Sequence, residues 1–335
     1  MFMVRKLAII TVAFLVTIEV QGKIESTEEQ ASSIKVKTQI SVTKEEFLVG
    51  EPIPMRTTVT NRNSEMIRIF NLLYLTLDFS AKDSSGRLVK GIRKPWLTGL
   101  SRTIAVPPAS DFNDVVFMNE YLDFPRPDFY TVTYKGSILF RIEPLESRGT
   151  HLQTVPVSGV VNVRLRQGLD SELESALREY LKLLKSGNRQ LESQAARALS
   201  VSEPTLAAKL LRQAVTDESG AYPSYTSQVT WALARIGTDE AIQVLSDIAM
   251  HYKNTMARTD AIDELGRQHI KKAVPTLVTL LSDQDSKIRV STLRALGCIG
   301  DKRRIPEIKL MLTDPDKEVR ATAENVYNML TKNEQ

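Results

Sequence analysis

The sequence predicts a two-domain protein in which an antiparallel β-sandwich is followed by an all-α solenoid. Hydrophobic residues recur with a period of two in the first half of the chain and with a helical period in the second half. The composition changes at Gln167-Gly168, because residues 23–169 hold four alanines and eight phenylalanines, whereas residues 170–335 hold 18 alanines and no phenylalanine. The second half also repeats itself at an offset of 31 residues, which is typical of stacked helical units.

The overall composition excludes several classes of protein. The chain of 335 residues is long enough for two domains, each with its own core. One cysteine excludes a disulfide scaffold, and three histidines argue against a histidine-built metal site. The 44 Lys and Arg residues nearly balance the 40 Asp and Glu residues, so the charge does not indicate a nucleic-acid binder.

Residues 1–22 are predicted to be a secretory signal peptide. Arg5 and Lys6 precede an apolar run of 12 residues, Leu7 to Ile18, and Val20-Gln21-Gly22 provides a cleavage point. At a helical rise of 1.5 Å the run covers about 18 Å, too short for a hydrocarbon core of roughly 30 Å. We therefore expect an exported protein, periplasmic or secreted, with no stable membrane insertion after signal removal. The absence of Asn-x-Ser/Thr acceptors favours a bacterial source.

Residues 23–33 are polar and are predicted to be a flexible leader, and residues 34–167 are predicted to form the β-sandwich. Apolar and polar residues alternate in Ile34–Val42, Leu73–Phe79 and Tyr130–Tyr134, as in strands with one buried face. Turn signals separate the strands, and one such turn is expected at Lys135-Gly136. Further strands are expected at Met55–Thr60, Ile67–Phe70, Val115–Phe117, Ile138–Ile142 and Val160–Leu165. About eight strands without intervening helices indicate a sandwich.

The sandwich region resembles the immunoglobulin-like domains of exported bacterial proteins and, more loosely, the bacterial proteinase-inhibitor sandwich family. The resemblance rests on Phe47-Leu48-Val49-Gly50-Glu51-Pro52-Ile53 and on Pro127-Asp128-Phe129-Tyr130-Thr131-Val132-Thr133-Tyr134. Relatives often have Pro-Gly before the tyrosine, where this chain has Pro127-Asp128-Phe129. Tyr130 is expected to anchor a strand corner through its hydroxyl group.

The repeats define residues 170–332 as a solenoid of about five helix pairs. Val274–Asp283 aligns with Ile305–Asp314, each position moved by 31 residues. The first helix of a pair has an apolar stripe of Val274, Leu277, Leu280 and Leu281, and the second has Val319, Ala323, Val326 and Leu330. Asp283 and Asp314 are predicted to be N-caps, and Gly237 and Gly300 to end helices in the left-handed conformation.

These repeats are similar to HEAT repeats, specifically to the short units of the phycocyanobilin lyases and of many bacterial proteins. The resemblance implies that Asp283, Arg289, Asp314 and Arg320 pair within or between units and hold the stack in register. Together with the resemblance of residues 34–167 to immunoglobulin-like domains, it implies a multidomain fold in which an immunoglobulin-like sandwich is followed by a HEAT-repeat solenoid. The lyase activity is not carried over, because it belongs to cytoplasmic pigment biosynthesis and this chain has an export signal.

The sequence contains no recognisable catalytic or cofactor-binding constellation. His151, His251 and His269 lack the spacing of metal ligands, and no phosphate-binding loop or nucleophile elbow is present. The runs Asp283-Gln284-Asp285 and Asp314-Pro315-Asp316 are not EF-hand loops, since their sixth positions are not glycine. Cys298 corresponds to arginines in earlier units, which leaves its exposure open, and we expect a small residue tolerated on a helix rather than a redox site. We expect no cofactor and no metal.

Two groups of basic residues are candidates for binding a partner. Lys271 and Lys272 occupy the same place in one unit as Lys302, Arg303 and Arg304 in the next, although Asp239-Glu240 interrupts the stripe. The alternative is a solvated edge without a partner. Arg93 and Lys94 precede Trp96, which would suit a binding loop. The alternative is that Trp96 is a core residue.

Together these features predict an exported, non-enzymatic scaffold that binds a protein partner, with the second helix of each pair forming the first face to examine. Two alternatives remain open at this stage. One is a proteinase inhibitor that acts through the sandwich, and the other is an enzyme whose site lies at the junction of the two domains.

Overall fold

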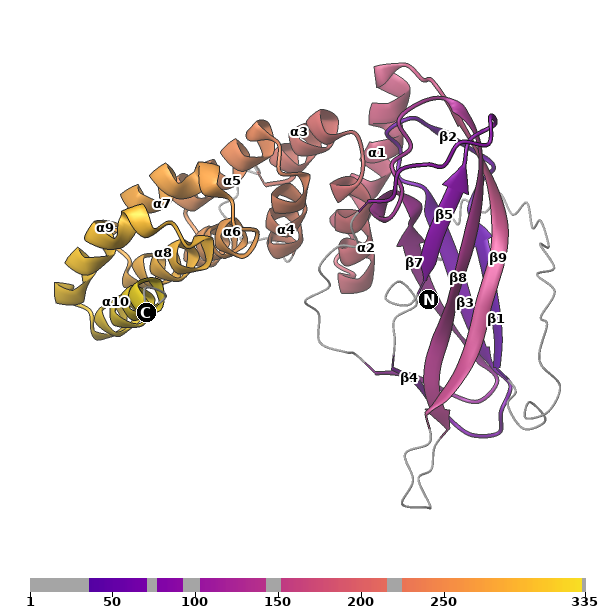
Figure 1. Cartoon of the computed structure of the whole chain (residues 1–335), viewed down its shortest axis with the longest axis horizontal. Coiled ribbons are helices and arrows are strands. Elements are labelled where there is room, and N and C mark those ends of the chain that lie inside the picture. The colour runs from indigo at the N-terminus through magenta and orange to yellow at the C-terminus, as the bar shows by residue number, and fades with distance from the viewer. Residues whose placement is uncertain (1–35, 71–76, 93–102, 143–151, 216–224, 333–335) are drawn as a thin grey trace, which may run out of the picture.

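The computed structural model describes residues 36–70, 77–92, 103–142, 152–215 and 225–332. The predicted signal peptide, leader, and Arg93, Lys94 and Trp96 lie outside these ranges. A two-sheet β-domain comes first, and a row of helix pairs extends away from one end of it (Figure 1). The predicted fold class, an all-β domain followed by an all-α solenoid, is confirmed.

The smaller sheet has three antiparallel strands in the order β1-β3-β7. These are β1 (Val36–Val42), β3 (Pro54–Asn61) and β7 (Ser110–Phe117). Successive side chains of a strand point in turn to the buried face and to the wet face, as the period of two predicts. The buried members include Ile40, Met55, Val59, Val116 and Phe117.

The larger sheet has six strands, and its path runs β2-β9-β8-β4-β6, with β5 also paired to β8. The strands are β2 (Glu46–Leu48), β4 (Ile67–Ile69), β5 (Asp78–Lys82), β6 (Ile104–Val106), β8 (Asp128–Ile142) and β9 (Gln153–Arg166). The β2–β9 pair is parallel, unlike the antiparallel pairs of the rest of the described sheet. Buried residues of both sheets form one hydrophobic core between them.

The turn predicted at Lys135-Gly136 is wrong, because β8 runs straight through it as one strand of 15 residues. Gly136 pairs with Val157 inside a long ladder with β9, and β9 begins seven residues before the predicted Val160. The pairing with β9 explains why the strand continues. Gly159 of β9 lies opposite Tyr134 of β8, and a Cβ at Gly159 would stand 2.4 Å from the Tyr134 hydroxyl. The glycines therefore fit the pairing of two long strands rather than a turn.

Tyr130 closes the end of β8 against the core. Its side chain is fully buried, and its hydroxyl group donates a hydrogen bond of 2.9 Å to the carbonyl oxygen of Arg126, four residues earlier. Its ring packs edge-on against Phe124 at 5.1 Å between centroids. Burial raises the pKa of this hydroxyl, with the charge of Asp128 acting in the same direction.

Over residues 170–215 and 225–332, the helical domain contains five helix pairs. The first helices of the pairs, the A row, are α1 (Asp170–Leu184), α3 (Pro204–Val215), α5 (Asp239–His251), α7 (Val274–Leu280) and α9 (Ile305–Leu310). The second helices, the B row, are α2 (Arg189–Ser200), α4 (Thr226–Ile236), α6 (Thr255–Arg267), α8 (Ser286–Ile299) and α10 (Lys317–Thr331). Figure 1 shows the two rows side by side, with α1 and α2 beside the β-domain and α10 at the far end.

Small residues bring neighbouring B-row helices close together. A Cβ added to Gly266 on α6 would lie 2.5 Å from the Cα of Ala295 on α8, so only glycine permits this approach. The apolar residues predicted for the stripes of α7 and α10 are buried, in a core that runs through all five pairs. An alanine-rich sequence suits this packing because thin helices stack closely.

Two helices of the B row, α4 and α8, end at a left-handed glycine, and several helices begin at a side-chain cap. Gly237 and Gly300 follow α4 and α8 with φ of 64° and 73°. His269 follows α6 with φ of 52°, at the place that aligns with Gly300. The N-cap assignments of Asp283 and Asp314 are wrong, because the caps of α8 and α10 are Asp285 and Asp316, whose carboxylates accept from Lys287 N and Glu318 N. Asp283 and Asp314 lie two residues earlier and bind arginines.

Candidate functional site

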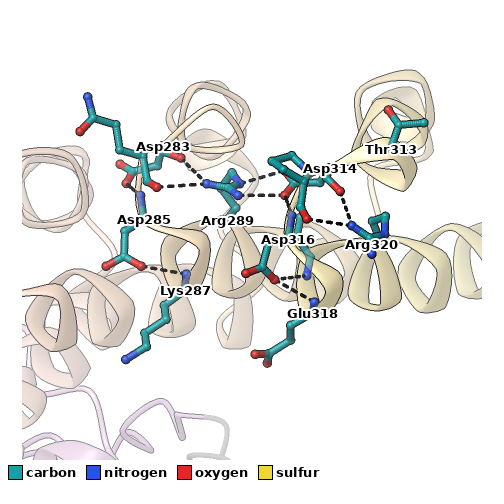
Figure 2. Close-up of polar contacts among 12 residues, drawn as sticks. Asp283, Asp285, Lys287, Arg289, Thr313, Asp314, Asp316, Glu318 and Arg320 are labelled. Atoms are coloured by element: carbon teal, nitrogen blue, oxygen red, sulfur yellow. Dashed lines mark hydrogen bonds and ion pairs between the residues drawn. The ribbon is translucent and has the colours of Figure 1, made fainter.

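The last units of the helical domain are joined by a ladder of aspartate and arginine side chains (Figure 2). Arg289 on α8 binds both carboxylate oxygens of Asp314, from Nε at 2.9 Å and from Nη2 at 2.8 Å. Its Nη1 donates to the carbonyl oxygen of Asp283 at 2.7 Å. Arg258 on α6 also binds both carboxylate oxygens of an aspartate 25 residues ahead, Asp283, but from Nη1 and Nη2. Each arginine thus holds the loop of the following unit.

The electrostatics of the ladder favour the ionised carboxylates. Burial acts to raise the pKa of Asp314, but the hydrogen bonds from Arg289 and from the Asp316 amide outweigh it and lower the pKa. The same balance lowers the pKa of Asp283, where Arg258 takes the place of Arg289. Arg320 ends the ladder, and its Nη1 donates to the carbonyl oxygens of Asp314 and Pro315. The ladder is therefore a structural arrangement, since the charged side chain of each member has a hydrogen-bond partner within the chain.

A second set of contacts joins the helical domain to the β-domain. Arg197 on α2 donates from Nε and Nη2 to the two carboxylate oxygens of Glu120, at 3.0 and 2.6 Å, and from Nη1 to the carbonyl oxygen of Val115 at 3.0 Å. Its guanidinium lies 5.7 Å from the ring centroid of Phe117, and that ring packs edge-on against Tyr180 of α1. Burial raises the pKa of the Tyr180 hydroxyl.

The loop after β2 completes the junction. Gly50 has a φ of 85°, and its carbonyl oxygen accepts a hydrogen bond of 2.9 Å from the amide of Glu203, at the start of α3. A Cβ at Gly50 would stand 3.0 Å from the Glu203 Cβ. Leu48 is buried in the core of the helical domain. The β-domain is therefore fixed to the first two helix pairs by both polar and apolar contacts.

An open hollow of about 340 Å³ lies on the B row directly beside this junction. Its lining comes from α2, α4 and α6, and we call it the α2–α4–α6 hollow. The lining residues are Ser193, Ala196, Arg197, Ser227, Gln228, Trp231 and Glu264.

Two charged groups at or beside the hollow are incompletely matched within the described part of the chain. Glu264 is 6% exposed, and its Oε1 pairs with Arg267 while its Oε2 has no hydrogen-bond partner there. Burial raises the pKa of this carboxyl group, although Arg267 and a hydrogen bond with the Gln268 side chain act to lower it. Arg235 stacks on Trp231, with 5.2 Å from the guanidinium carbon to the ring centroid, and its Nε has no hydrogen-bond partner. Burial lowers the pKa of Arg235.

A second hollow, of about 320 Å³, lies on the opposite side of the junction between β2 and α1. Its charges are matched within the chain. Glu51 accepts from Lys44 Nζ at 2.6 Å and from the Leu48 amide at 2.9 Å. Arg166 bridges Glu46 and Glu172, at 3.1 and 3.0 Å. This hollow resembles the ladder in having its polar groups satisfied.

The basic residues predicted to bind a partner are partly neutralised by acidic neighbours. Lys272 pairs with Asp239 of the preceding unit, so the acidic residues that interrupt the stripe also compensate it. Arg303 binds Asp301 at 2.8 Å, and Arg304 binds Glu307 at 2.7 Å. Lys271 and Lys302 begin short 3₁₀ turns ahead of α7 and α9. These residues form one edge of the helical domain, as the repeat alignment implies.

His269 and Cys298, which the sequence analysis also considered, lie where α6 meets α8. His269 Nδ1 lies 2.6 Å from the carbonyl oxygen of Cys298, which ties the end of α6 to α8, and the Cys298 side chain is exposed. Across the described ranges, no three His, Cys, Asp or Glu side chains are arranged to hold a metal ion. Nor is any helix within those ranges long and apolar enough to cross a bilayer.

The α2–α4–α6 hollow was not predicted from the sequence. One signal was present, because Glu264 aligns with Ala295 at the 31-residue offset and thus places a carboxyl group where a neighbouring unit has a buried small residue. The contact of Arg197 with Glu120, 77 residues apart across two domains, has no such signal.

Comparison with known proteins supports the fold. The HEAT-repeat family matches residues 249–328, so the helical domain contains a HEAT-repeat region. No curated protein matches the chain. Among solved structures, the CpcE–CpcF complex of phycocyanin lyase from Nostoc is similar at 26% identity over 47% of this chain and 65% of that chain, with a TM-score of 0.36.

Human deoxyhypusine hydroxylase is similar at 21% identity over 48% of this chain and 63% of that chain, with a TM-score of 0.34. A Salmonella alpha-2-macroglobulin is similar at 13% identity over 89% of this chain and 26% of that chain, with a TM-score of 0.21. The chain thus spans less than two thirds of the length of all three proteins. At these TM-scores the likenesses carry no argument about activity.

Proposed function

We propose that this chain is an exported, non-enzymatic scaffold that binds a protein partner on the B row of its helical domain, next to the β-domain. The observation that carries the proposal is the α2–α4–α6 hollow, an open concavity of about 340 Å³ on the B row beside the β-domain. Trp231 and Arg197 are part of its lining. A concave surface with an aromatic ring lets a partner bury apolar area in a pocket, as binding hot spots do.

The surrounding structure supports a binding surface rather than a catalytic one. The hollow offers an aromatic ring and an arginine, the residue types that dominate binding hot spots. Its lining holds two serines but neither histidine nor cysteine, and Ser227 Oγ donates to Gln228 Oε1. A serine nucleophile needs an adjacent general base, and no such pairing is found in this lining. HEAT repeats, which the helical domain contains, are typically protein-interaction scaffolds.

Site-specific photo-crosslinking of the mature chain, residues 23–335, tests the proposal. A photoreactive residue replaces the exposed Ser227 on α4, and the matched control carries it at the exposed Lys309 on α9 of the A row. In a periplasmic or secreted fraction, we expect one protein to be captured from position 227 and not from position 309. Equal capture from both positions, or none from position 227, would contradict the proposal.

The proposed export of the chain is tested by a separate measurement. The full chain expressed in a bacterial host should lose residues 1–22, and N-terminal sequencing of the exported form should begin at Lys23. Retention of the full-length chain in the cytoplasm would show that this part is wrong.

A further inference from the structure

Strand β9 has a long edge that no described strand covers. On one side it pairs with β8 along residues 153–165, without a bulge. On the other side only residues 164–166 are paired, with the short strand β2. Over residues 153–163 this second side therefore has no partner strand in the described part of the chain.

The main-chain groups along this edge point outward. The Arg164 amide donates to the carbonyl oxygen of Glu45 at 3.0 Å, on the side of β2. Main-chain groups of alternate residues in a strand point to the same side, so the next residues to do so are Ser158, Val160 and Asn162. All three are exposed. Their amide and carbonyl groups form a row of donors and acceptors that no described strand pairs.

The edge lacks most of the features by which proteins protect free strands. Natural edge strands carry charged side chains or bulges, or are very short. Residues 153–163 contain no charged residue and five valines, and Val160 is 46% exposed. Pro156 is an exception, because it removes one amide from the row. The free edge is thus bounded by Pro156 at one end and by the pairing of β2 at the other, and between them it can accept a further strand.

An added strand would place every second side chain over the open side of the sandwich. Strand β1 lies beside β9 across this side (Figure 1). Val36 of β1 and Val155 of β9 are only partly buried there, against the core that contains Val157 and Val161. The side chains of an added strand that point inward would cover these valines and must therefore be apolar, whereas the alternate side chains would remain in water.

We propose that the free edge of β9 binds an extended segment of a partner protein, which becomes an additional strand of the larger sheet and has apolar residues at every second position. Main-chain hydrogen bonds to Ser158, Val160 and Asn162 hold the segment, and its apolar residues select it. This site is separate from the B row, so the inference goes beyond the proposed function.

Two other occupants of the edge fit less well. The edge of a second copy, paired antiparallel about Val160, would bring its Pro156 opposite Arg164, where β2 is already paired. The predicted leader, residues 23–33, lacks apolar residues at alternate positions and carries Glu25, Glu28 and Glu29.

Binding of labelled peptides to the mature chain, residues 23–335, tests the inference. The probe is a fluorescein-labelled peptide of alternating threonine and valine, flanked by lysines for solubility. Two control peptides are N-methylated, one on the threonine amides and one on the valine amides. Because a strand directs only one of these sets to its neighbour, we expect one control to bind about tenfold more weakly by fluorescence anisotropy and the other to bind like the probe. Equal affinities of all three peptides, or no binding up to millimolar concentration, would overturn the inference.

Variants at Val160 locate the binding at the edge. Val160→Pro removes one amide from the row, as Pro156 already does, and preserves the pairing with β8 because this amide points away from β8. We expect the probe to bind about tenfold more weakly to this variant and normally to Val160→Thr, which keeps the amide. Val160→Lys puts a charge on the edge and should also weaken binding, which provides a second test if circular dichroism shows that the proline variant does not fold. Unchanged binding to the folded variants would contradict the inference.

Two further measurements identify the other occupants. If a chain that begins at Ile34 binds the probe and the mature chain does not, the leader covers the edge. If sedimentation velocity shows a dimer of the mature chain that Val160→Pro dissociates, a second copy covers it. Either result would overturn the assignment of the edge to a partner protein.

Discussion

The aspartate–arginine ladder and the α2–α4–α6 hollow are built on the same repeated helices, yet they treat buried charge in opposite ways. In the ladder, Arg289 and Asp314 satisfy each other with two direct hydrogen bonds. In the hollow, the Oε2 atom of Glu264 is left without a partner in the described chain. The difference lies within one helix, because α6 carries both Arg258, which binds Asp283 in the ladder, and Glu264.

The two regions meet on α6. The ladder begins at Arg258 of this helix and continues towards α10, in units that match the 31-residue repeat closely. The hollow extends from Glu264 of the same helix through α4 to α2, where the β-domain packs. Arg197 and Glu120 join α2 to the β-domain at that end of the solenoid. The following predictions test this contrast.

The largest effect is expected for Arg289→Ala in the ladder. The variant leaves the buried Asp314 carboxylate without its cation, and breaking a buried pair typically costs about 4 kcal/mol. Denaturant unfolding followed by circular dichroism measures the loss. Arg320→Ala is the matched control, since Arg320 occupies the same repeat position but contacts only carbonyl oxygens, and its loss should be much smaller. Equal losses would mean that the ladder does not stabilise the stack through paired charges.

A somewhat smaller effect is expected for Arg197→Ala at the junction. Glu120, whose side chain is 4% exposed, would lose both of its hydrogen bonds from the guanidinium, a cost of about 3 kcal/mol. Because the two domains also share apolar contacts, we expect loosened docking rather than unfolding of either domain. Small-angle X-ray scattering should show a larger radius of gyration. Arg212→Ala, which breaks a more exposed pair with Asp247 within the helical domain, should leave the dimensions unchanged.

The two-domain architecture could be predicted well because the sequence patterns that indicate it are periodic. Alternation and the 31-residue repeat depend on many positions at once, so they define the two domains and the stripes of α7 and α10. Single-residue assignments were less reliable. Asp283 and Asp314 have the chemistry of N-caps, but a cap two residues later, Asp285 or Asp316, leaves them free to bind arginines.

The candidate site was harder to predict because it depends on contacts between distant segments. Gly136 shows the problem within the β-domain, since only its partner strand explains why it is not in a turn. Arg197 shows it between domains, because nothing local to α2 indicates that Glu120 lies opposite. Glu264 is the exception, as a charged residue at an alanine position of the repeat is visible in the sequence itself.

The pH dependence of stability should distinguish the two regions by sign. Asp314 has a lowered pKa in the folded state, so its stabilising contribution is present above the pKa of the unfolded chain and is lost as the pH falls through the folded value. Asp314→Asn should therefore lose stability at pH 7 and converge with the native chain in acid.

Glu264 has a raised pKa, so its ionisation opposes folding above that pKa. The penalty shrinks as the pH falls through the folded value and is absent below the pKa of the unfolded chain. Glu264→Gln should be at least as stable as the native chain at pH 7 and should lose any advantage in acid. Unfolding midpoints measured between pH 3 and pH 8 test both variants. Parallel pH profiles for the two variants would remove the contrast between ladder and hollow.

The smallest effect is expected at the basic edge of the helical domain. Lys272 pairs with Asp239, but both side chains are more than two-thirds exposed, and exposed pairs contribute less than about 1 kcal/mol. Lys272→Ala should therefore leave the unfolding midpoint nearly unchanged and should not alter capture of a partner from position 227. Because this edge and the hollow lie on different parts of the repeat, a strong loss of capture in Lys272→Ala would move recognition from the α2–α4–α6 hollow to the surface charge of the edge.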